Sequence, residues 1–187
     1  MTFYGAKEMA ASFRTVRKNT IQIADDIPEG KYEFRAAPDT RTVAQTLVHI
    51  ALTPRSAVHI HKNGIDDLRK VNFQQVFQPI MAEEARPRTK AEIVQLLKSE
   101  GEEFAAFLDG LSDAFLAERV YSPFGANPSA PEHRTRFEML LSPKEHEMHH
   151  RAQLMVIERM IGVEPHLTRQ MQQRMAQAQT STGPQAR

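Results

Sequence analysis

The sequence contains no cysteine. This absence excludes disulfide bonds, thiolate metal ligands and cysteine nucleophiles. If the chain binds a metal ion, histidine, aspartate or glutamate side chains must hold it.

The chain also lacks an excess of charge of one sign. It has 24 basic and 23 acidic residues, a formal net charge of +1, and the two signs are interspersed. Such a surface has no strong field to attract nucleic acid or an anionic membrane. We therefore predict neither nucleic acid nor a membrane as a partner.

Long apolar runs are missing as well. No stretch reaches the roughly 18 apolar residues of a membrane-spanning helix, and the N-terminal residues hold no apolar run of signal-peptide length. We expect a soluble, cytoplasmic protein.

No segment alternates between apolar and polar residues over a convincing length, and no internal repeat is present, so we predict no strand. Apolar residues instead recur at helical three-and-four spacing. This pattern predicts an all-α fold, a four-helix bundle in one domain over residues 1–167. The predicted helices cover about residues 3–24, 40–64 with a bend or end at Pro54, 89–110 and 135–162, with a short extra helix around 71–77.

Capping patterns mark the helix starts. Thr42 with Gln45 and Thr89 with Glu92 form capping boxes. The last helix can begin at Thr135 or at Ser142, and the earlier start, with a bend at Pro143, is favoured. Residues 168–187 are polar and Gln-rich, which predicts a frayed extension or a disordered tail.

The last predicted helix contains three histidines in the string HEMHH. His146 and His150 lie one turn apart, about 40° from each other around the helix. They share a face with apolar residues, whereas Glu147, Arg151 and Glu158 fall on the other side. Two neighbouring buried imidazoles need partners, and a shared metal ion is the partner that their spacing favours.

A third ligand must come from elsewhere. His149 is about 60° around the helix from His146 and can support a site, but three ligands from one turn are cramped. His49 lies on a hydroxyl-rich face of the second helix, which is either an exposed polar surface or the lining of a wet pocket. His59 and His61 fit surface positions better. The remaining candidates are His133 and His166.

The string His146-Glu147-Met148-His149-His150 also matches H-E-x-x-H, a zinc-peptidase signature in which the glutamate activates water. The chain lacks the H-x-x-G-x-x-H continuation and any predicted strand to hold a peptide. The peptidase interpretation is therefore disfavoured.

Three stretches carry a resemblance to a known family: IPEGKYEFRAAPDTRTVAQTLVHIA, TKAEIVQLLKSEGEEFAAFLDGLSD and HEMHHRAQLMVIERMIGVEP. On these, and on a mid-helix histidine combined with H-x-x-x-H-R-x-Q, the sequence resembles the DinB (damage-inducible) family and the wider DinB/YfiT-like superfamily. The likeness extends over about residues 5–166.

The resemblance implies a four-helix bundle with one long crossover connection, usually a homodimer, holding a divalent metal on His49, His146 and His150. It also implies an activity like that of superfamily members with an assigned reaction, which are similar to thiol-dependent transferases or isomerases that use bacillithiol, mycothiol or glutathione.

Three histidines leave a metal position open, as in catalytic sites. The expected function is that of a metal-dependent hydrolase or thiol-dependent S-transferase acting on a small molecule, with zinc or nickel as the metal. Glu147, His149 and Gln153 are expected to support the ligands, and no catalytic residue is assigned. The alternative is a bundle that binds metal or ligand without catalysis.

Overall fold

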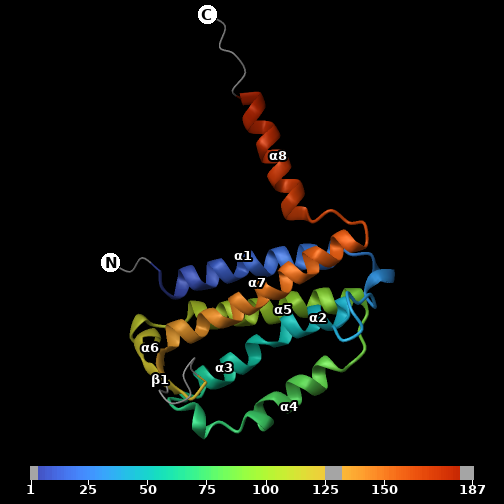
Figure 1. The fold of residues 1–187 in the computed structure, drawn as a ribbon. Coiled ribbons are helices and arrows are strands. Elements are labelled where there is room, and N and C mark those ends of the chain that lie inside the picture. Colours follow the sequence, from blue (N-terminus) through green and yellow to red (C-terminus); the bar gives the residue numbers. More distant parts are fainter. Residues whose placement is uncertain (1–3, 125–131, 182–187) are drawn as a thin grey trace, which may run out of the picture.

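Four long helices lie side by side in the computed structural model, which describes residues 4–124 and 132–181 (Figure 1). They are α1 (Ala6–Asp26), α2 (Val43–Leu52), α5 (Lys90–Asp109) and α7 (Arg136–Met160). Each of α1 and α2 packs against both α5 and α7. The prediction of an all-α four-helix bundle is confirmed.

Capping boxes begin three of these helices, as the sequence predicts. The side chain of Thr42 accepts a hydrogen bond from the backbone N–H of Gln45, and the Gln45 side chain accepts one from the N–H of Thr42. The same reciprocal pair forms at the start of α5 and of α7. Helix α7 therefore begins after Thr135, the earlier of its two predicted starts, and continues through Pro143.

Pro54 ends α2 and begins α3 (Pro54–Lys62) as its first residue. Proline is tolerated at a first helical position because the amide it lacks would have no partner there. The backbone of Thr53 keeps a helical conformation, with φ −52° and ψ −41°. The chain thus passes from α2 into α3 with little interruption.

The long connection after α3 is built around α4 (Phe73–Glu84), which is longer than the short helix predicted at 71–77. The side chain of Asn72 caps it by accepting from the N–H of Gln75. Helix α4 carries the chain back along the bundle, outside α2 and α3, before α5 begins (Figure 1). Two short 3-10 turns, Glu29–Lys31 and Leu68–Lys70, lie in the connections.

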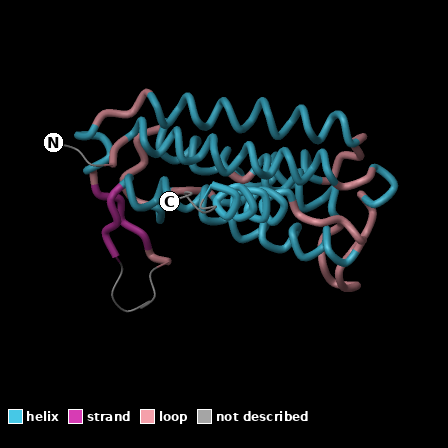
Figure 2. The backbone as a smooth tube through the Cα atoms, turned by 90° about the horizontal axis from the view of Figure 1, so that it is seen from above, coloured by secondary structure: helices cyan, strands magenta, loops and turns pink. Residues whose placement is uncertain are grey.

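The prediction that the chain has no strand is wrong. After the short helix α6 (Asp113–Ala117), strands β1 (Arg119–Ser122) and β2 (Glu132–Thr135) pair antiparallel. The hairpin sits at one end of the bundle (Figure 2). Four residues a strand are too few for an alternating pattern to stand out in the sequence. Residues 112–134 contain three prolines and Gly125, which predict a long irregular connection, but Gly125, Pro128 and Pro131 lie outside the described residues.

The C-terminal segment, predicted from residue 168 to be a frayed extension or a disordered tail, forms helix α8 (His166–Ser181). It extends away from the bundle in Figure 1. His166, its first residue, is buried, whereas residues 170–179 are all exposed. Within the described parts of the chain, no helix is both long and apolar enough to cross a membrane.

Candidate metal centre

Three histidines converge between α2 and α7. His146 Nε2 lies 3.2 Å from His49 Nε2 and 3.1 Å from His150 Nε2. One donor atom from each ring lies within 4.8 Å of the other two. The structure thus brings together the three residues that the resemblance implies as ligands.

His49 faces the bundle interior with 18% of its side chain exposed. The hydroxyl-rich face that carries it is not a plain solvent surface. Gln45 and Thr46 line a cavity of about 680 Å³ on one side of the histidines, and Thr53 and Ser56 line a second of about 330 Å³ on the other. Of the two interpretations of this face, the structure supports the pocket lining.

The larger cavity reaches the cluster at His150, and the smaller one reaches it at His146. The three histidines therefore lie between two cavities. Each cavity can admit a small molecule to one side of the histidine cluster. An open coordination position would face such a space.

Outer hydrogen bonds fix two of the rings. His49 Nδ1 lies 2.7 Å from Glu84 Oε1, and His150 Nδ1 lies 2.8 Å from Gln153 Oε1. A carboxylate or amide oxygen accepts, so each Nδ1 carries the proton and each Nε2 is left as a lone pair. This arrangement is typical of metal-ligating histidines.

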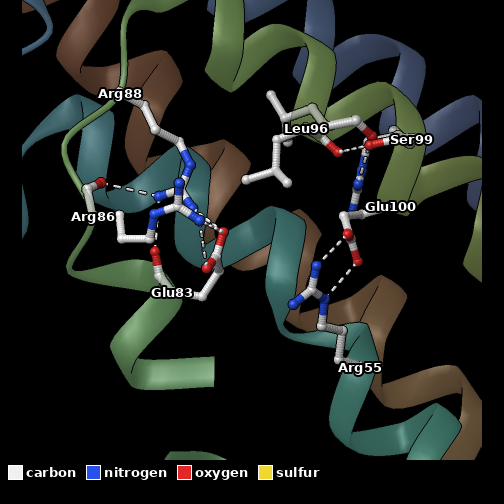
Figure 3. A network of polar contacts seen from close by, with 9 residues as sticks. Arg55, Glu83, Arg86, Arg88, Leu96, Ser99 and Glu100 are labelled. Atoms are coloured by element: carbon white, nitrogen blue, oxygen red, sulfur yellow. Dashed lines mark hydrogen bonds and ion pairs between the residues drawn. The ribbon is translucent and has the colours of Figure 1, made fainter. Parts of the chain in front are cut away.

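Glu84 lies in α4, in a region to which the sequence analysis assigned no chemistry. Its neighbour Glu83 is held by Arg88, with 2.5 Å between Glu83 Oε1 and Arg88 Nη2. Arg88 also donates to the Glu83 carbonyl, and Arg86 pairs with the Glu83 carboxylate (Figure 3). These bonds fix the end of α4 that brings Glu84 to His49. No local pattern marks Glu84, because it meets His49 only through the fold.

The convergence leaves hydrogen-bonding capacity unmet. With Nδ1 protonated on His49 and His150, both Nε2 atoms can only accept. A proton on His146 Nε2 can be donated to only one of them, so the other Nε2 has no hydrogen to accept from His146. The Nδ1 of His146 is buried and has no hydrogen-bond partner among the described residues.

A divalent ion bound to the three Nε2 atoms would satisfy their lone pairs. Metal–nitrogen bonds of about 2.0–2.1 Å place two ligand nitrogens about 2.9 Å apart in octahedral and about 3.4 Å apart in tetrahedral geometry. The two separations that involve His146, 3.1 and 3.2 Å, fall between these values, and the donor atoms of His49 and His150 lie within 4.8 Å of each other. Burial, aided by the neighbouring histidines, lowers the pKa of His146 to about 4. Burial also lowers the pKa of His150. Both rings are therefore neutral near pH 7, as metal ligands must be.

Gln153 and His149 lie beside the cluster. Gln153 contacts His150 through its oxygen, and its nitrogen lies 3.1 Å from His149 Nε2. His149 is exposed, and its ring also stands edge-on to the ring of His150, with 5.1 Å between the ring centroids.

The helical pattern predicted Glu147 and Glu158 on the outer face of α7, and this prediction is wrong. Glu147 is 1% exposed and Glu158 is fully buried. The Glu147 carboxylate points toward α1, where Arg17 Nε lies 3.0 and 3.1 Å from its two oxygens. It contacts Arg17 rather than a ligand histidine. The peptidase interpretation needs this glutamate free beside the metal, and its pairing with Arg17 argues against that role.

Arg17 joins all four bundle helices. Besides Glu147 of α7, it donates to the carbonyl of Leu97 in α5 at 2.9 Å and to that of Ile50 in α2 at 3.2 Å. Gly101 makes room for it, since a Cβ there would lie 2.6 Å from Arg17 Cγ. The sequence analysis did not identify this contact.

The other candidate histidines lie apart from the cluster. His61, predicted at the surface, is 2% exposed, and its Nδ1 lies 3.2 Å from Arg136 Nη1. Its burial lowers its pKa to about 4. His166 contacts Asn19. His59 and His133 are exposed.

A sequence model of the DinB superfamily matches residues 12–154. The chain belongs to the DinB superfamily. The matched segment contains all three converging histidines of this DinB-superfamily protein and ends before α8. No protein of curated function matches the sequence.

Solved structures share the DinB fold at low sequence identity. A DinB-like protein from Bacillus subtilis is 21% identical with a TM-score of 0.61, over 83% of this chain and 92% of its own. YfiT from Bacillus subtilis is 15% identical with a TM-score of 0.64, over 88% of this chain and 91% of its own. YfiT is described as a probable metal-dependent hydrolase with an unusual four-helix bundle topology.

Proposed function

We propose that this DinB-superfamily protein binds one divalent metal ion, zinc or nickel, on His49, His146 and His150 and hydrolyses a small molecule. The observation that carries the proposal is the convergence of three Nε2 atoms within 4.8 Å, two of them fixed as lone pairs by outer hydrogen bonds. Imidazole ligands suit zinc and nickel. The description of YfiT as a probable metal-dependent hydrolase supports the same class of reaction.

Three protein ligands leave at least one coordination position for water or substrate. When bound, the ion supplies Lewis-acid chemistry, which lowers the pKa of a coordinated water or thiol and polarises an electrophile. The chain's residues hold the geometry. Glu84 keeps the proton of His49 on Nδ1 and adds a negative charge, and Gln153 does the same for His150 without a charge. The two cavities supply room for the substrate beside the ligands.

Thiol-dependent S-transfer is a second candidate for the same site. The larger cavity, about 680 Å³, is roomier than a water nucleophile requires and can hold a small thiol together with an electrophile. A screen of small esters and amides without thiol, followed by electrophiles with low-molecular-weight thiols, separates hydrolysis from transfer. Metal binding without turnover in both screens would favour the non-catalytic alternative.

Metal analysis of protein purified without chelator tests the site. We expect about one equivalent per chain, and none in a His146→Ala/His150→Ala variant. A His133→Ala variant serves as the control, because His133 is exposed and lies in β2. Metal at the same level in both variants, or none in the unmodified protein, would contradict the proposal.

We also propose that the protein is a homodimer. Exposed apolar side chains on α7 and α8 outside the larger cavity support this, namely Met148, Met160, Met171 and Met175. Light scattering coupled to size-exclusion chromatography would show a mass of twice 21.3 kDa. A monomer at all concentrations would contradict it.

A further inference from the structure

Arg41 lines the larger cavity together with His150. It directly precedes Thr42, the residue that caps α2. Its side chain is exposed, and within residues 4–124 and 132–181 it has neither an ion-pair nor a hydrogen-bond partner. A guanidinium group carries five donors, so Arg41 presents unused donors to the cavity.

The other arginine of this cavity is engaged. Arg35 donates to the carbonyl of Thr40 at 2.5 Å. Farther along the bundle, Arg55 pairs with Glu100 between α3 and α5 (Figure 3). Arg41 therefore differs from Arg35 in having a head group without a partner among the described residues.

The charge of the cavity favours an anion. Its lining contains two arginines, Arg35 and Arg41, and one carboxylate, Asp39, which leaves one positive charge in excess. A divalent ion on three neutral histidines would add two more.

The rest of the lining is partly polar, through Thr40, Gln45, Thr46 and Gln153, and partly aliphatic. Ala36, Val156 and Ile157 supply the apolar part, and among the described residues no Phe, Tyr or Trp lines the cavity. Val156 is 57% exposed, so this apolar surface is open to a ligand. An aliphatic group of a few carbons would remove it from water.

We propose that the larger cavity binds a small aliphatic carboxylate, with its acid group on Arg41 and its hydrocarbon chain against Val156 and Ile157. A guanidinium group binds a carboxylate through two parallel hydrogen bonds, and one free arginine matches one such group. This inference rests on the proposed function, since it makes Arg41 the residue that selects the substrate of the same centre. The functional group to be hydrolysed or transferred would then lie at the histidine end of the cavity.

Titration calorimetry with hexanoate and with hexanamide tests the proposal, because the two differ in charge and little in shape. We expect hexanoate to bind at least about ten-fold more tightly, equivalent to about 1.4 kcal/mol. The preference should be lost in Arg41→Gln and partly kept in Arg41→Lys. The control is Arg151→Gln, which removes the same charge from α7 at a residue outside the cavity lining.

A carboxylate could instead bind the metal ion directly, so the titrations are made with metal-loaded and with chelator-treated protein. A preference that survives Arg41→Gln would overturn the proposal, as would equal affinities for hexanoate and hexanamide in the unmodified protein. Tighter Arg41-dependent binding of methyl phosphate than of acetate would overturn the carboxylate assignment. Metal content, measured on the same samples, tests the proposed metal centre separately.

Discussion

Two clusters of buried polar groups lie next to each other in the bundle, and they differ in how their hydrogen bonds are met. Around Arg17, both oxygens of Glu147 and the carbonyls of Ile50 and Leu97 accept from one guanidinium. At the histidines, three Nε2 atoms approach each other with too few protons to share. The first cluster is complete within the chain, whereas the second is complete only with a cation.

The two clusters are joined through adjacent residues. Glu147 follows His146 in α7, and Ile50 follows His49 in α2. Because successive side chains of a helix point about 100° apart, α7 presents His146 to His49 of α2 and Glu147 to Arg17 of α1, whereas α2 contacts Arg17 through the backbone carbonyl of Ile50. The Arg17 cluster therefore holds α2 and α7 at the separation that brings their histidines together. We infer that it positions the centre without taking part in its chemistry.

Breaking the complete cluster should have the largest effect. Glu147→Ala would leave the buried guanidinium of Arg17 without its counter-charge, and removal of one partner of a buried ion pair destabilises proteins by about 3–5 kcal/mol. Urea unfolding measures this loss. A double variant, Arg17→Met/Glu147→Leu, should recover much of it, since no unpaired charge remains. A loss below about 1 kcal/mol in Glu147→Ala would show that the pair does not hold the bundle.

Removing the hydrogen bond that orients a ligand of the histidine cluster should have a smaller effect, confined to metal affinity. Glu84→Gln removes the carboxylate that orients His49, and such a change lowers metal affinity about 10- to 100-fold. Competition with a chromogenic chelator measures it. Glu145→Gln is the matched control, because Glu145 lines the smaller cavity beside His146 without a hydrogen bond to a ligand histidine. Equal affinities in the two variants would remove Glu84 from the centre.

A third buried group extends the comparison to the effect of pH. Glu158 is fully buried, and neither of its oxygens has a hydrogen-bond partner in the described part of the chain. Burial, reinforced by the negative charge of Asp26, raises its pKa to about 7 from an ordinary value of 4.5. The folded protein therefore favours the protonated carboxyl, and stability should be lost as the pH rises from about 5 through 7.

The expected change between pH 5 and pH 8 is about 2–3 kcal/mol, because a pKa raised from 4.5 to about 7 corresponds to about 1.4 kcal/mol per unit and most of the rise lies in this range. Denaturant unfolding across this range measures it. In Glu158→Gln the contribution should disappear. An unchanged pH dependence in that variant would mean that Glu158 does not carry the proton.

The sequence predicted those parts of the fold and centre that depend on local spacing. Thr42–Gln45, Thr89–Glu92 and Thr135–Glu138 placed helix starts correctly, since each cap depends on residues three apart. The spacing of His146 and His150 placed both on one interior face. His49 was reached through the resemblance to the DinB family, because the residues around it allowed both an exposed and a pocket position.

Contacts between distant segments could not be predicted in this way. Glu84 meets His49 across 35 positions of the chain, and Arg17 meets Glu147 across 130. Glu147 appeared to belong to the outer face because a charged residue in a helix is usually solvated. A buried arginine on a neighbouring helix reverses that expectation, and no pattern within α7 predicts the presence of this arginine.

The most direct test of the incomplete cluster is the effect of zinc on the free energy of unfolding, compared between the unmodified protein and His49→Ala. With free zinc at about 1,000 times the dissociation constant, the unmodified protein should gain about 4 kcal/mol. His49→Ala retains His146 and His150 but loses the ligand that α2 supplies, and it should gain little. An equal gain in both proteins, or none in either, would contradict a centre completed across the bundle by His49.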